Sequence, residues 1–560
     1  MKSKQKKGKK AVNTGTPRLE SCLGRPAFAI TILAALTFAV YARSLFLDYT
    51  RLDDSIFIVE NAQYNEDAKN IGVSFQRGLF NPTKDAYYRP LFLVDFILES
   101  RLFGTRPAGY HFTNLLFHIL SVTLLYLFLK RIKIPPVDSF LLALLFALHP
   151  VLTQAVAWIP GRNDMMLMIF FLSAFILLFR YTDHPGPWPL FFHFLFFTAA
   201  LFTKETAVII PLIMAGFMLI YMKTGWRKLI LPAATWLAAA GIWMLVRSSA
   251  TLSNEWISPA AMIRAGTERL VVIIQYLGKI FLPVNLTVFP EAQDITIVWG
   301  LISLAGLAAL VAWSKSYRSP LTWIGLFWFL IFLVPALIVP KNLNDQVFEH
   351  RLYLPIVGIL LLLSQAFPFR EEVRPVVKIT LISAIAVIFS VQIIIRTGYF
   401  SDAVTFWTHA VEGSPNSVYA KTLLGTKVTD TTERERLFRE ARLIDPNHKN
   451  LNYYLGKVLF DQGMRDSAEY YLRYEVARNP VADAWFLLAQ IEFNRERYDS
   501  AAANLERVLA LDPLNPQANH NLALLYFQHG HPDKSREVVR GMQLKGMAVE
   551  ENLLRMVSGE

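Results

Sequence analysis

The sequence predicts an all-α polytopic membrane protein followed by an α-solenoid of tetratricopeptide repeats. Apolar runs of membrane-spanning length fill the chain up to about residue 397. A helix of roughly 20 residues crosses about 30 Å of hydrocarbon. Beyond that point the chain has the composition of soluble helices, and Pro446, Pro480 and Pro513 mark a period near 34. This period is the spacing of the tetratricopeptide helix pair.

About eleven spans are expected. The lysine-rich opening "MKSKQKKGKK" is interpreted as part of a cytoplasmic basic tail over residues 1–25, with RNA or lipid-headgroup binding as the alternative. With the N-terminus inside, the short basic loops all fall on the inner side, which agrees with the positive-inside rule. The expected spans are about 26–46, 111–129, 139–157, 165–181, 188–203, 207–222, 229–246, 295–313, 321–339, 352–367 and 376–396.

One further apolar segment, 268–286, is expected to be interfacial or re-entrant. It contains Gln275 and Lys279 and begins with Glu268-Arg269. A lysine near the centre of a span costs about 2.5–3.5 kcal/mol on insertion. Leaving this segment out keeps an odd number of crossings and places the C-terminal region outside.

Composition excludes some classes of protein. Of 560 residues, 54% are hydrophobic, against about 45–50% in soluble proteins. The net charge of +12 does not indicate nucleic-acid binding, because many basic residues lie in short loops between apolar runs. One cysteine, Cys22, excludes a disulfide framework. No small-residue cleavage site follows the first apolar run, which is therefore expected to be a retained signal anchor.

The C-terminal region is predicted to be a recognition surface. Stacked helix pairs form a concave groove that binds polypeptide, and a spacer or oligomerisation module is the alternative. "NSVYAKTLLGTKVTDTTERERLFREARLIDP" is a shortened first repeat, and "FWTHAVEGSP" is a lone helix that joins the array to the membrane part. The close-packing positions are Leu455-Gly456, Leu488-Ala489 and Leu522-Ala523 in first helices, and Ala468, Ala501 and Ser535 in second helices.

Ionisable residues collect in the loops expected outside. Each one alone is explained by a structural ion pair or a snorkelling helix end. Together, charges of both signs at one end of the spans indicate a functional site. The first outer loop, about 47–110, carries Asp53-Asp54 and Arg89, and His111 begins the next span; later turns carry Arg162, Asp164, Lys204, Glu205, Glu349, His350 and Arg351.

Such a face suits a sugar donor that is linked to a lipid phosphate at headgroup level. The reaction needs a base for the acceptor hydroxyl and cations that hold the phosphate as charge builds on it. Asp53 and Asp54 are the predicted catalytic acids, and Asp54 is the preferred base although the spacing does not separate the two. The predicted donor-phosphate cations are Arg89, Arg162, Lys204 and Arg351, and His350, Glu205, Asp164, Glu349 and His111 complete the predicted substrate-binding set.

At these residues the chain resembles a known group. "ALHPVLTQAVAWIPGRNDMM" is similar to the "LHPVxxEAVAWIxGRxDLL" stretch of the transmembrane and tetratricopeptide-repeat-containing proteins. "YYRPL", "FTKET" and "EHRLYLP" match further stretches of that group in the same order, and a repeat array follows the membrane part in both. The resemblance covers nearly the whole chain after residue 40.

The resemblance implies a membrane glycosyltransferase of the GT-C type, similar to protein O-mannosyltransferases. Such enzymes use a polyprenyl-phosphate sugar, invert the anomeric centre and carry an acidic pair in the first outer loop, which maps onto Asp53 and Asp54. Their layout has an odd set of spans, often eleven, with lumenal or periplasmic repeats. This chain has Gln154 where the group often has Glu, and His350 where animal members tend to have Arg, with Arg351 one place later. The sugar and the phosphate-holding cation are therefore not transferred.

The expected organisation is a GT-C-like catalytic domain over 26–397 and an extracytoplasmic repeat domain over 398–560. The expected reaction moves a hexose, possibly mannose, from polyprenyl phosphate to Ser or Thr hydroxyls of exported proteins that the repeats present. The alternatives are a membrane-anchored tetratricopeptide scaffold, a lipid-linked polysaccharide ligase or a transporter. The lipid-linked sugar is a substrate, and a divalent metal is left open. The expected location is the bacterial inner membrane with periplasmic repeats, or the ER membrane with lumenal repeats.

Overall fold

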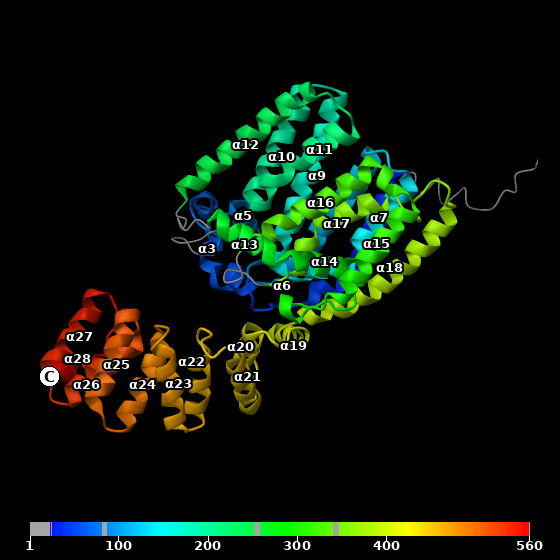
Figure 1. Cartoon of the computed structure of the whole chain (residues 1–560). Coiled ribbons are helices and arrows are strands. Elements are labelled where there is room, and N and C mark those ends of the chain that lie inside the picture. The colour runs from blue at the N-terminus through cyan, green and yellow to red at the C-terminus, as the bar shows by residue number, and fades with distance from the viewer. Residues whose placement is uncertain (1–22, 24, 81–86, 251–257, 340–345, 559–560) are drawn as a thin grey trace, which may run out of the picture. The chain divides into compact units, whose positions relative to one another are not determined.

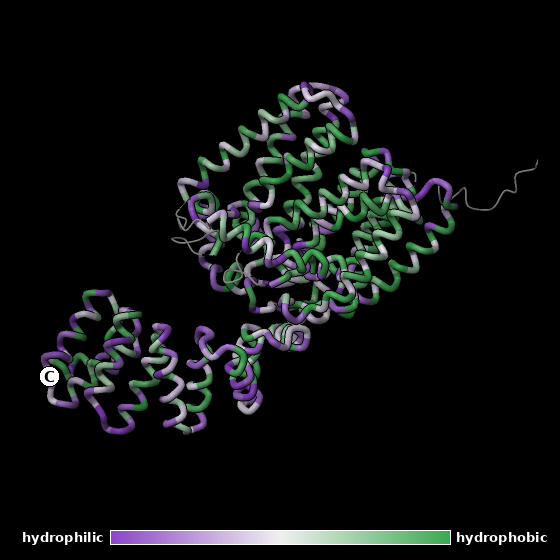
Figure 2. Tube along the Cα trace, in the orientation of Figure 1, coloured by the Kyte–Doolittle hydropathy of each residue, from purple (hydrophilic) through white to green (hydrophobic). Residues whose placement is uncertain are grey.

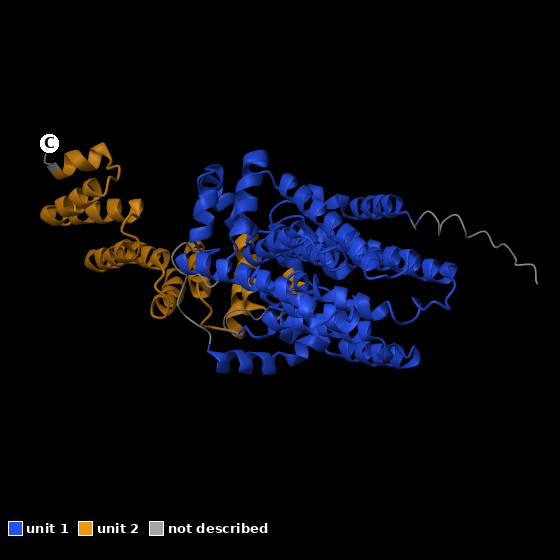
Figure 3. Ribbon diagram, turned by 90° about the horizontal axis from the view of Figure 1, so that it is seen from above, with its two compact units in different colours: residues 1–409 blue, residues 410–560 orange. Residues whose placement is uncertain are grey.

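The computed structural model describes residues 23, 25–80, 87–250, 258–339 and 346–558. Within these ranges the regular structure is helical, and the one β-type contact is an isolated antiparallel bridge between Glu291 and Gln346. The predicted basic tail, 1–25, falls almost entirely outside the described residues. The chain divides into two compact units, Met1–His409 and Ala410–Glu560 (Figures 1 and 3). The division falls inside helix α19 (Ala403–Gly413), twelve residues after the expected boundary at 397.

The first unit holds the apolar helices, which Figure 2 shows as mostly hydrophobic along their length. Six described helical segments are long and apolar enough to cross a membrane, and a seventh is a pair bent by 48°. The chain is therefore an integral membrane protein. The six are α2 (Pro26–Tyr41) with η1 (Ala42–Phe46), α6 (Pro107–Arg131), η5 (Ile159–Gly161) with α9 (Arg162–Asp183), η8 (Trp226–Leu229) with α12 (Ile230–Ser249), α16 (Pro320–Leu337) and α18 (Pro375–Thr397) with η12 (Gly398–Phe400); the bent pair is α7 (Pro136–Ala147) with η4 (Pro150–Leu152) and α8 (Thr153–Ala157).

The predicted count of about eleven spans is not confirmed. The remaining apolar helices are 9 to 17 residues long, and α17 (Pro355–Leu363) would cover only about 14 Å at 1.5 Å per residue. The segment 268–286 forms α14 (Leu270–Phe281), which is also too short for a straight span. The other short helices of this part are α10 (Pro187–Thr203), η6 (Glu205–Ile209), α11 (Ile210–Gly216), η7 (Phe217–Tyr221), α13 (Pro259–Glu268), η9 (Ala292–Asp294), α15 (Val298–Trp313), η10 (Ser316–Arg318) and η11 (Glu349–Leu352).

The first expected outer loop contains several short helices. The π-helix η2 (Ser55–Glu60) directly follows the acidic pair. Its Phe57 and Ile58 are buried, and the Phe57 ring packs on Phe92 and Phe96 of helix α5 (Pro90–Phe103). This apolar contact holds the acidic loop against the membrane unit. The loop also contains α3 (Ala62–Glu66), α4 (Asn70–Val73) and η3 (Ser74–Gln76).

Glycines allow two pairs of helices to approach closely. An added Cβ at Gly358 in α17 would lie 2.3 Å from the carbonyl oxygen of Gly325 in α16, and one at Gly325 would lie 2.4 Å from that of Gly358. Gly278 in α14 meets Gly300 in α15 in the same way, at 2.7 Å from the backbone nitrogen. Lipid supplies no hydrophobic driving force for helix association. Small residues at such crossings let the helix backbones pack closely, and this packing stabilises the contact instead.

Ion pairs lie at both ends of the helix bundle. At one end Lys378, near the start of α18, donates to Asp138 at 3.0 Å, and Arg131 pairs with Asp183 at the end of α9. Helix α9 begins at Arg162 and has 22 residues, so it carries the chain about 33 Å to that end. This length matches about 30 Å of hydrocarbon. The end at which α9 begins is called the site end below.

The second unit confirms the repeat prediction. The positions predicted for close packing are buried, and an added Cβ at Gly456 would lie 2.8 Å from Leu472 Cγ. The shortened first repeat is also a helix pair, in which Gly425 lies against the ring of Phe438. The pairs are α20 (Val418–Lys427) with α21 (Thr431–Ile444), α22 (Leu451–Asp461) with α23 (Arg465–Val476), α24 (Ala482–Asn494) with α25 (Tyr498–Leu511) and α26 (Pro516–Gln528) with α27 (Pro532–Leu544), and α28 (Glu551–Ser558) follows them.

The Gly325–Gly358 crossing provides a test of the fold. Gly358→Ala is expected to destabilise the protein by about 1–3 kcal/mol, because the methyl group has no room against a backbone oxygen. Gly306→Ala in α15 is the matched control, since no atom lies within 4 Å of an added Cβ there; it is expected to be neutral or to stabilise the helix by up to about 1 kcal/mol. Thermal unfolding in detergent measures both variants. Equal unfolding temperatures would contradict this packing.

Candidate active site

The two adjacent acids have different surroundings. The Asp54 side chain is 1% exposed, and both of its oxygens accept hydrogen bonds. Oδ2 accepts from the backbone N–H of Thr50 at 2.6 Å and from its hydroxyl at 2.8 Å, and Oδ1 accepts from the N–H of Ser55 at 2.9 Å. Asp54 thereby caps η2 and closes the turn that contains Arg51, whose φ is +58°. This carboxylate holds the loop together.

The Asp53 carboxylate is half-buried and makes no hydrogen bond or ion pair within the described part of the chain. Burial raises its pKa from 3.8 to about 6; the negative charge of Asp54 also raises it, and the positive charge of Arg89 lowers it. A carboxylate with this pKa is mostly ionised at pH 7 and can accept a proton. The structure therefore separates the two acids, which the sequence does not.

Arg89 lies at the N-terminus of α5, where Glu205 holds it. The Arg89 Nε donates to Glu205 Oε2 at 3.0 Å, and the backbone N–H of Tyr88 donates to the other carboxylate oxygen at 2.9 Å. The two terminal guanidinium nitrogens make no hydrogen bond among the described residues. Glu205, predicted to bind substrate, instead orients Arg89, and leaves the end of the guanidinium available.

Lys204 is paired with the start of α9. Its Nζ lies 2.6 Å from Asp164 Oδ1 and 3.2 Å from Asn163 Oδ1. The Lys204 side chain is 13% exposed and the Asp164 side chain 5%. The predicted turn charges are thus brought together as an ion pair at the site end, with one edge of the lysine open.

Arg162 has a different role from the predicted one. Its side chain is completely buried, and Nη1 lies 2.6 Å from Asp95 and 2.6 Å from Glu99. Nε donates to Asn114 Oδ1 at 2.8 Å, and Nη2 donates to the carbonyl oxygen of Tyr110 at 2.7 Å. Every guanidinium nitrogen is engaged by protein, so no face is left for a donor phosphate. Arg162 joins α5, α6 and α9.

Glu349 is likewise a structural clamp and not a substrate ligand. It is 0% exposed and pairs with Lys279 at 2.7 Å and with Arg396 at 2.7 Å. The N–H of Thr287 donates to it at 3.0 Å. These contacts tie η11 to α14 and to the end of α18, which explains why a lysine is tolerated in the apolar segment 268–286.

His350 and Arg351 follow this clamp on η11. Gln154 Oε1 accepts from the backbone N–H groups of Glu349 and His350 at 2.8 and 3.1 Å, while its Nε2 donates to the carbonyl of Val288 at 2.8 Å. A glutamate at position 154 lacks that donor. Arg351 donates through Nη1 to the carbonyl of Gln346 at 2.7 Å and stays half-buried.

The pKa of His350 shows which charges share its surroundings. Burial lowers this pKa well below 6.5, and the positive charges of Lys204, Arg351 and Arg89 lower it further, in that order. The imidazole is therefore neutral at pH 7. The charges of three cations from three different segments thus act on one uncharged ring, and one of them, Arg89, also acts on Asp53.

His111 is buried inside the protein. It is 1% exposed, and neither ring nitrogen has a hydrogen-bond partner among the described residues. A donor phosphate has no access to it in this structure, so its predicted substrate-binding role is not supported. Among the described residues there is also no group of three or more His, Cys, Asp or Glu that could hold a metal ion.

Sequence reasoning missed the partners of the buried cations. Asp95 and Glu99 lie four residues apart on an otherwise apolar helix, which places them on one face. Arg396 lies in the last turn of an apolar span. Ionisable residues inside apolar segments indicate a site by default, and this rule would have found all three. Their pairing partners are distant in sequence and needed the structure.

The fold and the site define a polytopic membrane protein with a group of cations, an acid that has no partner among the described residues, and a tetratricopeptide array. The array matches the tetratricopeptide repeat family over residues 453–503 and the TPR repeat family over 489–530. Human protein O-mannosyl-transferase TMTC4 is 24% identical over 525 residues, which are 80% of this chain and 66% of that protein. Mouse protein O-mannosyl-transferase TMTC1 is 32% identical over 199 residues, 33% of this chain and 21% of that protein.

Mouse protein O-mannosyl-transferase TMTC3 is 31% identical over 163 residues, 28% of this chain and 17% of that protein. The chain thus spans about a fifth of the length of TMTC1 and TMTC3. The resemblance to the transmembrane and tetratricopeptide-repeat-containing proteins is confirmed. Among solved structures, ArnT from Cupriavidus metallidurans bound to undecaprenyl phosphate aligns over 82% of this chain and 80% of its own, at 14% identity and a TM-score of only 0.31.

The Arg162 clamp provides a second test. Arg162→Lys keeps the charge but not the fork of donors, so it leaves buried acceptors unsatisfied and is expected to destabilise the protein by about 1–3 kcal/mol. Arg264→Lys, at an exposed position on α13, is the control and should leave unfolding unchanged. Thermal unfolding in detergent is the measurement. Unchanged stability of the Arg162 variant would contradict the clamp.

Proposed function

We propose that the protein is an inverting membrane glycosyltransferase of the GT-C type. It moves a hexose, possibly mannose, from a polyprenyl-phosphate donor to Ser or Thr hydroxyls of exported polypeptides. The observation that carries this proposal is the carboxylate of Asp53, which has no hydrogen bond or ion pair among the described residues. It lies near Arg89, one of the three cations, with Lys204 and Arg351, whose charges act on His350. The relatives named protein O-mannosyl-transferases support the reaction class.

Asp53 acts as the general base in this proposal. It removes the proton of the acceptor hydroxyl as the hydroxyl oxygen attacks the anomeric carbon, while the bond from that carbon to the phosphate oxygen breaks. Attack opposite the leaving phosphate inverts the centre. Asp54 positions the loop through Thr50 and Ser55, and its negative charge raises the pKa of Asp53. This assignment differs from the sequence-based prediction, which prefers Asp54 as the base.

The cations stabilise the departing phosphate. A polyprenyl-phosphate sugar carries one negative charge, and the released lipid phosphate carries a second, so charge builds on its oxygens in the transition state. Arg89 presents its free guanidinium edge bidentately, as suits phosphate, whereas Lys204 acts as a point charge. Arg351 reaches the same face from η11. The neutral His350 adds ring surface and a nitrogen that can bond a sugar hydroxyl.

The repeats present the acceptor, and the site end faces the periplasm or the ER lumen in this proposal. Both parts follow from the basic loops expected on the opposite side and from the polypeptide-binding groove of stacked repeats. A scaffold that only anchors the repeats would not need Asp53. Substitutions at this acid therefore distinguish the enzyme from the scaffold.

Asp53→Asn is expected to lower transfer about 10²–10⁴-fold, the contribution of a general base, without loss of folding. Asp54→Asn should lose less activity, because its amide oxygen can still accept from Thr50, and its main effect should be on stability. Asp67→Asn, at an exposed acid of the same loop, is the control. Transfer from polyprenyl-phosphate mannose or glucose to a Ser/Thr peptide by reconstituted protein is followed by mass spectrometry.

The relative transfer activities of these variants decide which acid is the base. Full activity of Asp53→Asn together with an inactive but folded Asp54→Asn would return the role of base to Asp54. Full activity of both would remove the acidic pair from the mechanism.

The pH dependence tests the same group independently. The pKa of Asp53 is raised to about 6, and only its ionised form accepts a proton. kcat/KM should be level above about pH 6 and fall about tenfold for each pH unit below it, since this parameter reports the free enzyme. The residual activity of Asp53→Asn should lack this inflection. An inflection that persists in that variant would assign it to another group.

A further inference from the structure

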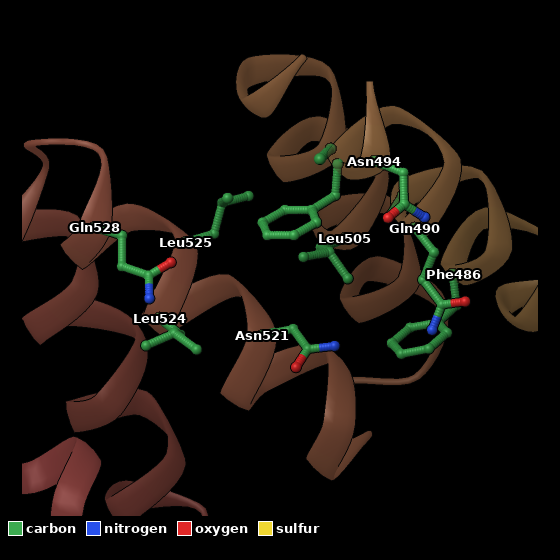
Figure 4. Close-up of a pocket in the computed structure, with 11 residues that line it drawn as sticks. Phe486, Gln490, Asn494, Leu505, Asn521, Leu524, Leu525 and Gln528 are labelled. Carbon is green, nitrogen blue, oxygen red and sulfur yellow. The ribbon is translucent and has the colours of Figure 1, made fainter. Parts of the chain in front are cut away.

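A cavity of about 330 Å³ lies in the second unit between helices α24, α25 and α26. Helices α24 and α26 are the first helices of consecutive repeats, and Figure 4 shows side chains from both directed toward the space between them. The floor is apolar, formed by Phe486, Phe493, Leu505, Leu524 and Leu525. No site described above includes this cavity.

The polar lining of this cavity consists of carboxamides. They are Gln490, Asn494, Asn521 and Gln528, and none of their side chains makes a hydrogen bond within the described residues. Each carboxamide offers two N–H donors and one acceptor oxygen. The lining residues include no ionisable side chain. Polar groups that converge on an apolar pocket without partners of their own are typical of a ligand site.

Two of the charged residues next to the cavity are neutralised by ion pairs. Glu492, on the same helix as Gln490, is 2% exposed and pairs with Arg473 at 2.7 Å. Arg495, directly after Asn494, pairs with Asp466 and Glu469. No net charge is thus directed at the cavity from these neighbours, and an ionised ligand group would lose hydration there without gaining a counter-charge.

We propose that this cavity binds an uncharged, extended polypeptide segment through one bulky apolar side chain. The apolar floor takes that side chain, and the carboxamides bond the N–H and C=O groups of the flanking backbone, which an extended segment leaves unpaired. The volume lies at the lower end of the roughly 300–1,000 Å³ range of ligand pockets, so it suits one side chain with its adjoining backbone.

The cavity therefore selects the acceptor. Ser/Thr-rich segments that carry an apolar residue and no charge are retained, and acidic or basic segments are not. This role as acceptor site rests on the proposed transferase function, whereas peptide binding itself does not.

The probe is a fluorescent nonapeptide, Gly-Ser-Thr-Ser-Leu-Ser-Thr-Ser-Gly, with blocked termini, titrated by anisotropy against the full chain in detergent. Replacement of its leucine by glycine or aspartate is expected to weaken binding at least tenfold. Asn521→Trp, which fills the cavity, should abolish binding, and Asn494→Ala and Asn521→Ala should each weaken it about fivefold, the effect of one net hydrogen bond. Gln543→Ala, an exposed carboxamide on α27, is the control.

Equal binding of the leucine and aspartate peptides would overturn the proposal. So would unchanged binding by Asn521→Trp, provided that its thermal unfolding matches that of the parent. If the tryptophan variant unfolds, Asn521→Ala, which enlarges the cavity without filling it, is used instead. Unchanged peptide binding by that variant would then overturn the proposal.

A transfer assay on the same proteins separates this inference from the proposed function. Asp53→Asn should bind the leucine peptide normally and transfer sugar about 10²–10⁴-fold more slowly than the parent. Peptide binding by a parent protein that transfers no sugar would leave the cavity assignment intact and contradict the transferase. Transfer to the leucine and aspartate peptides at equal rates would contradict the selection of acceptors.

Discussion

The membrane unit depends on one constraint: a charge among apolar helices must find all of its partners within the protein. Arg162 meets it completely, because two carboxylates, an amide and a carbonyl occupy all of its guanidinium nitrogens. Replacing buried ion pairs by apolar residues is often neutral or stabilising. We therefore attribute these ion pairs to the positioning of the helices and not to a gain in stability. It fixes α5, whose N-terminus carries Arg89, against α9, whose first turn carries Asp164.

A second clamp, centred on Glu349, positions the cations that follow it in sequence. Lys279 and Arg396 pair with this carboxylate and hold η11 in place. The side chains of His350 and Arg351 on η11 therefore have a defined orientation. Of the acids predicted for the site, Asp53 is the one without a hydrogen bond or ion pair among the described residues. This difference in pairing is the basis for proposing Asp53 as the base.

The two units differ in how their charged residues are distributed. In the membrane unit charges are concentrated at the helix ends, and α9 separates two sets of ion pairs by about the thickness of the hydrocarbon. In the repeat unit, which Figure 2 shows with far more hydrophilic residues, charges are spread over exposed surfaces and paired along helices. The cavity between α24 and α26 is left neutral. In our proposals the charged donor and the uncharged peptide are accordingly assigned to different units.

The sequence by itself determined the all-helical class, the repeat array with its buried small residues, and the end of the helices at which charges gather. These features follow from local periodicity and hydropathy, which need no knowledge of long-range contacts. Only the tertiary structure decided which charged side chains form ion pairs with one another. Arg162 and Asp95 are 67 residues apart, and Glu349 and Lys279 are 70 apart. It also separated Asp53 from Asp54, since adjacent residues differ only in the hydrogen bonds that the folded loop provides.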